Sequence, residues 1–265
     1  MTLNSASNRQ VTLLRKLNRK KYRYKEQLFL IEGARAVQQI LESGIISVRA
    51  LFFDEDQQYW LQDEWRLSSK NIESCTLAGD LFAEVSDTDT PQGVLALCRI
   101  PDEADIDDLA MSQGIVIAFD AVQDPGNLGT IIRTATWFEA SGILSGKGTV
   151  DLFHPKVVRG TAGATGTIPH KNGDLSEILS AFEEKGWSIF LLDAGDDAVS
   201  LPDIHPTGKS IIVVGNEAHG INADLMTERR TKVRIPSPQK RPQVESLNAG
   251  VAASIALYDL AGKQS

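Results

Sequence analysis

The sequence predicts an α/β protein of two units, the second of which is built on a mostly parallel sheet. Short apolar segments alternate along the chain with segments whose apolar residues recur at helical spacing. Residues 101–113 are acidic and polar without a sustained apolar period, which is typical of a linker. Beyond them, strands such as 115–119 and 210–214 are apolar throughout, as in a parallel sheet covered by helices on both faces. The 265 residues suffice for one large or two ordinary domains.

The first unit is predicted to cover residues 26–100. It begins with a short apolar strand at 28–31. A helix follows at 32–43, because apolar residues from Ala34 to Leu41 lie on one stripe and Gly44 ends it. The other elements predicted in this unit are strands 48–53, 72–77 and 94–100 and helices 59–67 and 81–85.

The second unit is predicted to cover residues 114–265, with strands and helices in alternation. The predicted strands are 115–119, 142–144, 168–170, 188–192, 210–214 and 232–235. The predicted helices are 128–140, 155–162, 175–185, 222–230 and 247–262. The last helix is small and apolar on nearly all sides, which predicts burial inside the domain or against another subunit.

Positive charge is concentrated at the N-terminus. Residues 1–25 contain eight Lys or Arg and no acidic residue, so this segment carries +8. Because the whole chain carries −8, the remaining residues carry −16. Tyr22 and Tyr24 lie within the basic segment, and basic side chains with interleaved aromatic rings suit phosphates and stacked bases. The alternative is a solvated basic helix face without a nucleic-acid role.

Composition and motifs exclude several classes of protein. No apolar stretch reaches the roughly 18 residues that span a bilayer, and the N-terminus lacks the apolar core of a secretory signal. Cys75 and Cys98 have neither CxxC spacing nor nearby His partners, so neither a zinc site nor a disulfide framework is expected. We find no P-loop, Ser-His-Asp order or paired-carboxylate signature. A cytoplasmic protein with no metal and no membrane partner is therefore expected.

The segment from Asp124 to Arg133 carries polar residues that suit a ligand. Asp124 followed by Pro125 can cap and open a helix, although Asn127 is a second candidate for the cap. Gly129 lies one helical turn before Arg133, which predicts a notch beside a cation, suited to a phosphate or a ribose. The alternative is an ordinary ion pair between Arg133 and a surface carboxylate.

Two further polar turns follow strands that end at the same edge of the second sheet. The glycines of the turn Gly215–Gly220 favour a tight bend with an exposed backbone. This turn is not a GxGxxG fingerprint and follows a late strand, which disfavours a nicotinamide-dependent metabolic enzyme. Glu217 can cap a helix that begins near Asn222 or accept backbone amides. Ser246 is a plausible N-cap of the last helix.

Taken in order, these segments resemble the SpoU/TrmH branch of the SPOUT family, the knotted RNA ribose 2′-O-methyltransferases. The matching residues are Asn127-x-Gly129-x3-Arg133-x-Ala135 as motif 1, Gly215-Asn216-Glu217-x2-Gly220 as motif 2, and Ile235-Pro236 with Ser246-Leu247-Asn248 as motif 3. Residues 155–159 also match the segment between motifs 1 and 2. The N-terminal unit, from Phe29 to Ile100, resembles the substrate-binding domain of these enzymes, which is similar to the ribosomal-protein L30e fold.

The resemblance implies a second domain tied in a deep trefoil knot, a rare exception to unknotted chains. It also implies that S-adenosyl-L-methionine is the cofactor. The residues that it places at the cofactor are Gly215, Asn216, Gly220, Ile235, Pro236 and Leu247. Arg133 is the implied catalytic residue, and the implied supporting residues are Asn127, Glu217, Ser246 and Asn248.

The implied substrate is RNA, and the extra N-terminal domain favours ribosomal RNA over transfer RNA. A homodimer through the knotted domain is also implied. The alternatives are a tRNA 2′-O-methyltransferase and a non-catalytic RNA-binding protein of the same fold. The sequence departs from the family at Ala218 and Glu139, where glycines are usual, and in a long loop at 235–246.

Overall fold

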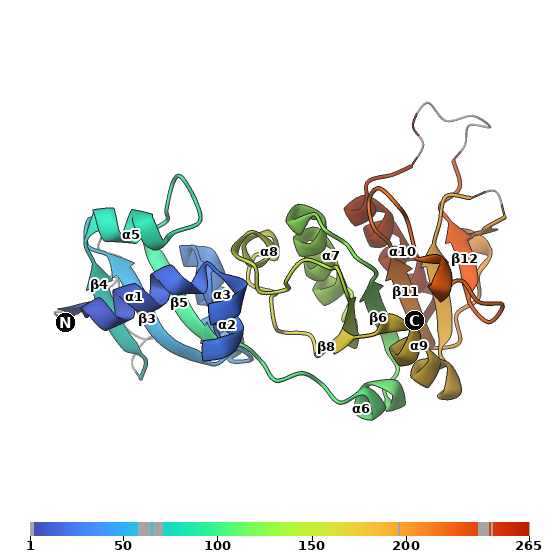
Figure 1. Ribbon diagram of the computed structural model, residues 1–265, viewed down its shortest axis with the longest axis horizontal. Coiled ribbons are helices and arrows are strands. Elements are labelled where there is room, and N and C mark those ends of the chain that lie inside the picture. The colour runs from blue at the N-terminus through green and yellow to red at the C-terminus, as the bar shows by residue number, and fades with distance from the viewer. Residues whose placement is uncertain are drawn as a thin grey trace. The chain divides into compact units, whose positions relative to one another are not determined.

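The chain forms two compact units in the structure, a computed structural model that describes residues 3–57, 65, 71–195, 197–237, 244 and 246–264 (Figure 1). The first unit comprises Met1–Pro101 together with Asp151–Thr167. The second comprises Asp102–Val150 together with Ile168–Ser265. The segment Asp151–Thr167 thus belongs to the first unit by its contacts, although the sequence places it within the second predicted domain.

The first unit contains, among the described residues, a mixed sheet of five strands in the order β1-β4-β3-β5-β2. Its strands are β1 (Asn4–Ser5), β2 (Leu28–Glu32), β3 (Val48–Asp54), β4 (Glu73–Leu77) and β5 (Val94–Arg99). Strands β1 and β3 are parallel to β4, whereas β5 is antiparallel to β2 and β3. The sequence did not predict β1, because two residues are too few to show an alternating pattern.

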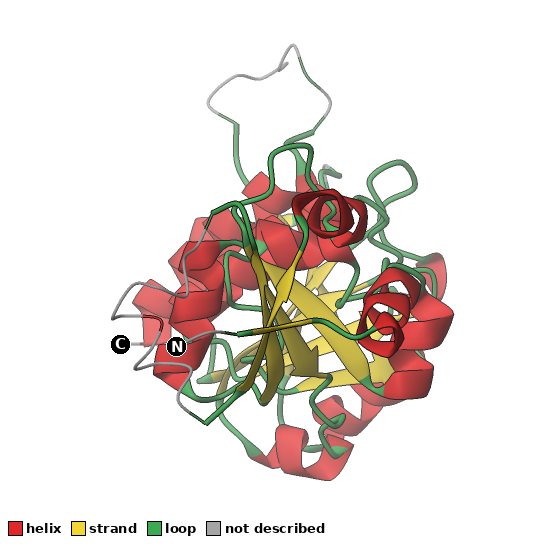
Figure 2. Ribbon diagram, turned by 90° about the vertical axis from the view of Figure 1, so that its left-hand side faces the viewer, coloured by secondary structure: helices red, strands yellow, loops and turns green. Residues whose placement is uncertain are grey.

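Helices pack against the strands of the first unit (helices red and strands yellow in Figure 2). The described helices of the first unit are α1 (Asn8–Leu17), α2 (Lys20–Glu26), α3 (Ala34–Ser43), α5 (Gly79–Val85) and α8 (Pro155–Gly160). Ser7 and Gln10 form a capping box that begins α1, and its apolar stripe of Val11, Leu14 and Leu17 is buried in the core. The basic N-terminal segment is therefore folded onto the first unit. The helix predicted at 59–67 lies outside the described residues, apart from Trp65.

The second unit contains, within the described ranges, a sheet of seven strands in the order β10-β12-β9-β11-β6-β7-β8, all of them parallel. The strands are β6 (Gly114–Phe119), β7 (Gly142–Gly146), β8 (His170–Gly173), β9 (Ser188–Leu192), β10 (Val199–Ser200), β11 (Lys209–Val214) and β12 (Thr231–Arg234). This sheet confirms the predicted parallel α/β architecture. The trefoil knot stays a prediction.

The described helices of the second unit pack around this sheet. They are α6 (Ile106–Met111), α7 (Pro125–Trp137), α9 (Leu175–Glu184) and α10 (Ala249–Gln264), with short 3-10 turns at Leu201–Asp203 and Ala223–Leu225. The segment predicted as a linker contains α6, because the Asp105 side chain caps it and Leu109 and Ala110 are buried. No helix in the described part of the chain is long and apolar enough to cross a membrane.

One sequence prediction is wrong in this unit, and one departure from the family pattern has a distinctive backbone conformation. The helix predicted at 222–230 is wrong, since only the 3-10 turn at Ala223–Leu225 forms there. Arg230 turns inward instead, and its guanidinium donates to the Leu225 carbonyl and to the Glu183 carboxylate. Glu139, which replaces a usual glycine, has a φ of +53°, a conformation that glycine adopts without steric cost.

Candidate active site

The turns after β6 and β11 meet at the carboxyl edge of the second sheet. The two strands are paired in parallel, with Val214 opposite Phe119, so their following residues emerge side by side. The Asp120 side chain accepts a hydrogen bond from the Asn222 amide at 2.6 Å, and the Asp120 amide donates to the Val214 carbonyl at 2.8 Å. Contacts between residues about a hundred positions apart therefore hold the two turns together. The meeting of these turns at the carboxyl edge is the position predicted for a ligand site in an open α/β fold.

Helix α7 begins at this edge, and its cap is Asp124. The Asp124 side chain accepts the Asn127 amide at 2.7 Å, and Pro125 occupies the first helical position. This confirms Asp124 and not Asn127 as the N-cap. The side chain of Asn127 is consequently left for other partners.

The turn Gly215–Gly220 is tighter than its sequence suggests. The backbone groups of Asn216 and Gly220 donate to each other in two hydrogen bonds of 2.9 Å. A Cβ on Gly215 would lie 2.4 Å from the Gly220 carbonyl carbon, so only glycine fits there. The Asn216 side chain accepts the amides of Ala218 and His219 and donates to the Ala121 carbonyl. Asn216 thus shapes the turn, and one N–H of its side-chain amide keeps no partner among the described residues.

Glu217 projects from that turn and fastens the start of α7. One carboxylate oxygen accepts the Asp124 amide and the Asn127 side-chain amide, each at 3.1 Å, and the other accepts the Gln123 amide at 3.1 Å. Partial burial raises the pKa of Glu217, but these hydrogen bonds outweigh it and hold the pKa below its ordinary value. Glu217 is therefore a carboxylate with occupied oxygens, and it accepts backbone amides instead of capping a helix near Asn222.

Asn127 connects this clamp to the last helix. Its side-chain NH2 group donates to Glu217, and its side-chain oxygen accepts a hydrogen bond of 2.8 Å from the side-chain NH2 group of Asn248. The Asn248 oxygen in turn accepts the backbone amides of Gly250 and Val251, which makes Asn248 the cap of α10. The sequence proposed Ser246 for that cap, and this is wrong because α10 begins two residues later than predicted. Three motifs far apart in sequence are thus joined in one hydrogen-bonded chain.

Helices α7 and α10 lie side by side and run in the same direction. Asn127 contacts Asn248, Thr134 shares a 3.1 Å hydrogen bond with Ser254, and the Phe138 ring lies 6.1 Å from the Tyr258 ring. Sequence reasoning missed the Thr134–Ser254 contact, because no motif marks either hydroxyl. A partial signal was present in the shared spacing of four residues between 134 and 138 and between 254 and 258.

The backbone N–H and C=O groups of three residues predicted to bind the cofactor remain available for hydrogen bonds to a ligand. Among the described residues, no backbone hydrogen bond involves Gly215, Ile235 or Leu247. Gly215 and Ile235 follow β11 and β12, which both end at the carboxyl edge, and Leu247 precedes α10. Pro236 is exposed, and the Leu247 side chain is 46% exposed. This set offers amide donors, carbonyl acceptors and apolar surface, which fits an adenosine group held mainly by backbone.

Arg133 stands apart from the clamp. It lies on α7, is exposed, and has no ion-pair or hydrogen-bond partner among the described residues. The alternative of an ion pair with a surface carboxylate is therefore not observed. Gly129 is buried, so it does not form the open notch that the sequence predicted beside the guanidinium. The described residues contain no group of three His, Cys, Asp or Glu side chains placed to hold a metal ion.

The basic N-terminal segment divides into exposed and buried charges. Arg23 is 1% exposed, and its guanidinium donates to the Asp151 carboxylate and, at 2.8 Å, to the Leu17 carbonyl. The Tyr24 hydroxyl donates to the same carboxylate at 2.9 Å. Tyr22 is covered by Lys16, whose ammonium lies 5.7 Å from the ring centroid. Arg23 and Tyr24 are thus structural.

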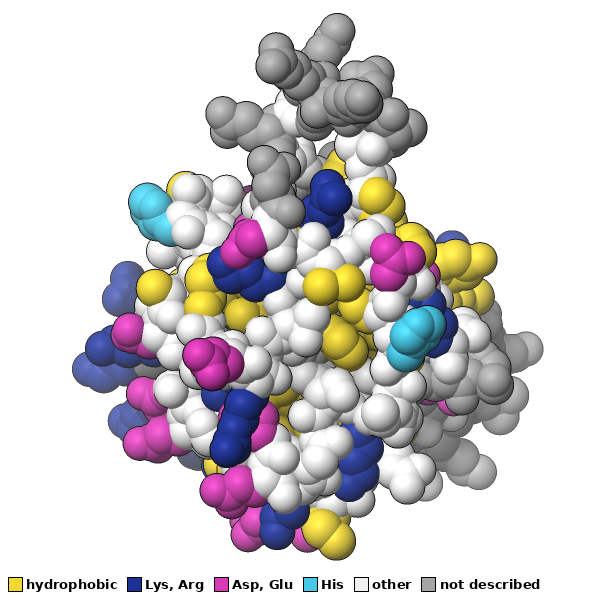
Figure 3. Space-filling view, turned by 90° about the vertical axis from the view of Figure 1, so that its right-hand side faces the viewer, with side chains coloured by type: hydrophobic (Ala, Val, Ile, Leu, Met, Phe, Trp, Pro, Cys, Tyr) yellow, Lys and Arg dark blue, Asp and Glu magenta, His cyan; other side chains and the backbone are white. Residues whose placement is uncertain are grey.

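The other seven basic residues of this segment are exposed. They are Arg9, Arg15, Lys16, Arg19, Lys20, Lys21 and Lys25. Only Arg15 among them forms an ion pair within the described residues, with Glu84. By contrast, the face in Figure 3 carries Lys and Arg interspersed with Asp and Glu. Excess positive charge is therefore concentrated on α1 and α2.

The fold and this edge define the class of protein as a parallel α/β ligand-binding domain joined to a second unit with basic N-terminal helices. The sequence profile of the SpoU rRNA Methylase family matches residues 114–258, and that of the MRM3-like substrate binding domain matches residues 8–96. The chain therefore belongs to the SpoU rRNA Methylase family, which confirms the family predicted from the motifs.

Individual relatives agree over nearly the full chain. The 23S rRNA (guanosine(2553)-2'-O)-methyltransferase RlmP of Bacillus subtilis is 33% identical over 264 residues, covering 98% of this chain and 99% of the relative. The mitochondrial rRNA methyltransferase 3 of Xenopus tropicalis is 27% identical, covering 91% of this chain and 71% of its own. This chain is also similar to an AdoMet-bound rRNA methyltransferase from Sinorhizobium meliloti whose crystal structure is known. The two are 25% identical with a TM-score of 0.82, and the match covers 97% of this chain and 96% of that chain.

Proposed function

We propose that this protein transfers a methyl group from S-adenosyl-L-methionine to a ribose 2′-hydroxyl of ribosomal RNA. The observation that carries the proposal is the hydrogen-bonded chain from Glu217 through Asn127 to Asn248, because it draws all three family motifs to one sheet edge. Membership of the SpoU rRNA Methylase family and the rRNA methyltransferase relatives support the reaction and the substrate class.

The cofactor would be held by the backbone at Gly215, Ile235 and Leu247, with Pro236 and the Leu247 side chain against its apolar parts. Gly220, with a φ of +69°, closes the turn that presents Gly215. S-adenosylmethionine, when bound, supplies an electrophilic methyl group on a sulfonium. The clamp of Glu217 and Asn127 fixes the two turns beforehand, which lowers the entropy cost of positioning the reactants.

Arg133 would bind the RNA phosphate next to the reacting ribose and align its 2′-hydroxyl. A guanidinium does not lose its proton in proteins, so Arg133 is not the base. Glu217 accepts three amide hydrogen bonds, whereas Asp124 and Asp120 each accept one backbone amide and keep free acceptor positions. The hydroxyl proton would pass to an oxygen of the phosphate that Arg133 holds or to a nearby carboxylate, as the bond from the ribose oxygen to the methyl carbon forms and the bond from that carbon to sulfur breaks, leaving a neutral thioether.

The test is methyl transfer by the purified protein to total RNA from a strain that lacks it, read as 2′-O-methylnucleosides by mass spectrometry. We expect one new methyl in the rRNA fraction. Arg133→Ala should lower turnover at least about 1,000-fold, equivalent to about 4 kcal/mol of transition-state stabilisation. Its cofactor affinity in calorimetry should stay near that of the wild type.

Arg229→Ala is the matched control, because Arg229 is an exposed arginine of the same unit and should be dispensable. Loss of cofactor affinity in Arg133→Ala would place Arg133 in the cofactor site and contradict its proposed role as a phosphate ligand. A methyl found only in tRNA would instead support the tRNA alternative, and none in any RNA would support a non-catalytic RNA-binding protein.

We also propose a homodimer through the exposed faces of α7 and α10. Val251, Ile255 and Tyr258 form one stripe on α10 and are 48%, 37% and 70% exposed, and Trp137 on α7 is 81% exposed. The Phe138–Tyr258 contact brings α7 and α10 together at this stripe. An apolar face on two adjacent helices is typical of a subunit interface.

Light scattering during size-exclusion chromatography tests the dimer. Ile255→Asp should convert a dimer of the wild-type protein to a monomer, because it places a charge within the apolar face. Met111→Asp is the control, since Met111 is 67% exposed on α6 and outside this face. A monomeric wild type, or a dimer that persists in Ile255→Asp, would contradict the proposed interface.

A further inference from the structure

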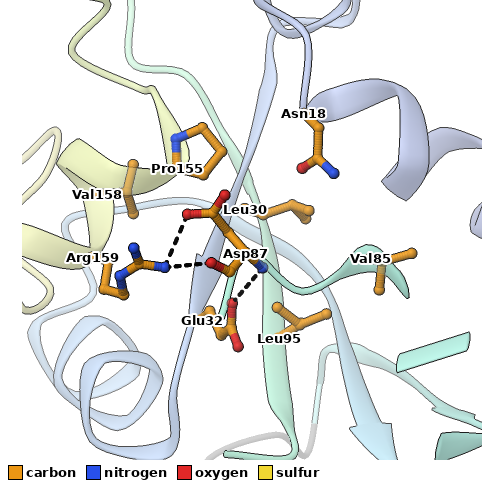
Figure 4. Close-up of a pocket in the computed structure, with 9 residues that line it drawn as sticks. All are labelled: Asn18, Leu30, Glu32, Val85, Asp87, Leu95, Pro155, Val158 and Arg159. Carbon is orange, nitrogen blue, oxygen red and sulfur yellow. Dashed lines mark hydrogen bonds and ion pairs between the residues drawn. The ribbon is translucent and has the colours of Figure 1, made fainter. Parts of the chain in front are cut away.

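A hollow in the first unit lies outside the candidate active site and has a mixed polar and apolar lining. It is a shallow, open depression, with about 330 Å³ of space when the solvent at its mouth is included. Its apolar floor consists of Leu30 on β2, Leu95 on β5, Val85 on α5 and Val158 on α8 (Figure 4). Such a floor suits one flat apolar face.

The polar side chains at the rim of the hollow differ in how many of their hydrogen-bonding positions are already occupied. The Asn18 side chain, directly after α1, extends toward the floor in Figure 4 and makes no hydrogen bond among the described residues. The Glu32 carboxylate accepts the Asp87 amide at 3.1 Å and the Ser86 hydroxyl, so each oxygen keeps one further acceptor site. The Arg159 guanidinium is already bound to Asp87. It donates to the backbone carbonyl of Asp87 at 2.7 Å and to the side-chain carboxylate of Asp87 at 2.9 Å.

The charges around the hollow indicate which chemical class of ligand it can bind. Arg19, Lys20 and Lys21 follow Asn18 directly, are exposed, and can neutralise phosphates outside the mouth. Glu32 and Asp87 at the rim would repel a phosphate inside it. A ligand with negative charge outside and N–H donors inside matches this arrangement, and a nucleotide within an RNA chain has both features.

We propose that this hollow receives one unstacked base of the RNA substrate, with Asn18 and Glu32 reading its edge, an inference that rests on the proposed RNA methyltransferase function. RNA is recognised mainly at splayed bases of loops and bulges, through an apolar or aromatic face and the Watson–Crick edge. Glu32 favours bases that present N–H donors, above all guanine, whose adjacent ring and amino N–H groups match a carboxylate. Uracil is disfavoured, because its single ring N–H lies between two carbonyls that a carboxylate repels.

Binding of fluorescent RNA hairpins, measured by anisotropy at one fixed salt concentration, tests this inference. The probes share one stem and carry loops rich in guanine or in uracil, and a blunt duplex of the same length serves as the unlooped probe. The wild type should prefer the guanine loop. Asn18→Ala should weaken guanine-loop binding roughly three- to tenfold, as expected for one lost hydrogen bond. Duplex binding should not change.

Glu32→Gln should reduce the ratio of guanine-loop to uracil-loop affinity, because the amide no longer disfavours carbonyls. Asn18→Trp, which fills the hollow from its exposed mouth, should weaken binding of both loops. The matched controls are Asn8→Ala and Glu26→Gln, exposed residues of α1 and α2 that do not line the hollow. Folding of every variant is checked by circular dichroism.

Unchanged loop binding in Asn18→Ala and Asn18→Trp would overturn the inference, as would equal weakening of loops and duplex. Methyl transfer to rRNA, measured on the same variants, separates the two proposals. If the wild type methylates rRNA while the variants bind loops normally, only the base site is wrong. If the wild type methylates no RNA while loop preference is lost in the variants, the base site stands and the catalytic proposal fails.

Discussion

The N-terminal helices and the carboxyl edge of the second sheet each contain an arginine that the sequence marks as a candidate for binding RNA. Arg23 is buried at 1% exposure, and its guanidinium is paired with Asp151 and with a backbone carbonyl. Arg133 is exposed and unpaired within the described residues. The same side chain thus stabilises the fold in one region and remains available to a ligand in the other. Burial and partners, not residue type, decide which role a charge has.

The largest effect expected from this comparison is on stability. Arg23→Ala leaves Asp151 buried without its cation and should lower the free energy of unfolding by about 3–5 kcal/mol. Arg15→Ala is the matched control, because its pair with Glu84 is exposed and should contribute less than about 1 kcal/mol. Urea denaturation of both variants measures the difference. Equal losses would show that the buried pair is not the stronger one.

A smaller effect is expected at the clamp of the sheet edge. Glu217→Gln should destabilise the protein by about 1 kcal/mol at neutral pH, because a side-chain amide has one oxygen and cannot accept all three hydrogen bonds. The loss is small because solvent screens the charge of this partly exposed carboxylate. Hydrogen bonds hold the pKa of Glu217 below its ordinary value despite partial burial, so its contribution is present above about pH 4.5 and lost as pH falls through the lowered value.

Denaturation as a function of pH checks this sign. The wild-type protein should lose stability relative to Glu217→Gln on acidification below about pH 4.5, and the two curves should run parallel above it. Glu228→Gln is a suitable control, since Glu228 is an exposed residue of the same unit. A constant difference between the wild type and Glu217→Gln at every pH would mean that the carboxylate charge is not what fastens the turns.

The smallest effect concerns one exposed charge of the N-terminal helices. Lys21→Ala should reduce the slope of log affinity for rRNA against log salt by roughly 1, with little change in stability, because one phosphate contact is lost. Filter binding at several salt concentrations measures the slope. Arg35→Ala, an exposed residue on α3, is the control. An unchanged slope in Lys21→Ala would remove Lys21 from the RNA surface.

Much of the fold could be predicted from sequence, because its signals are local. Continuous apolar runs predicted β6, β9 and β11 and hence a parallel sheet, and Asp124 followed by Pro125 predicted how α7 begins. The errors occurred where local signals conflict. Acidic residues concealed α6, whose first turn they stabilise, and the polar residues after Asn222 form only a 3-10 turn.

By itself, the sequence determined the parallel fold, the three motifs and the residues that carry them, since each depends on neighbours a few positions away. Only the tertiary structure decided what those residues touch. It assigned Asn216 to its own turn, Glu217 and Asn127 to a clamp across motifs, and Asn248 to the cap of α10. It also divided the N-terminal charges between a buried pair and an exposed surface. Hydrogen bonding and burial depend on residues far apart in the chain, and no local pattern records those distances.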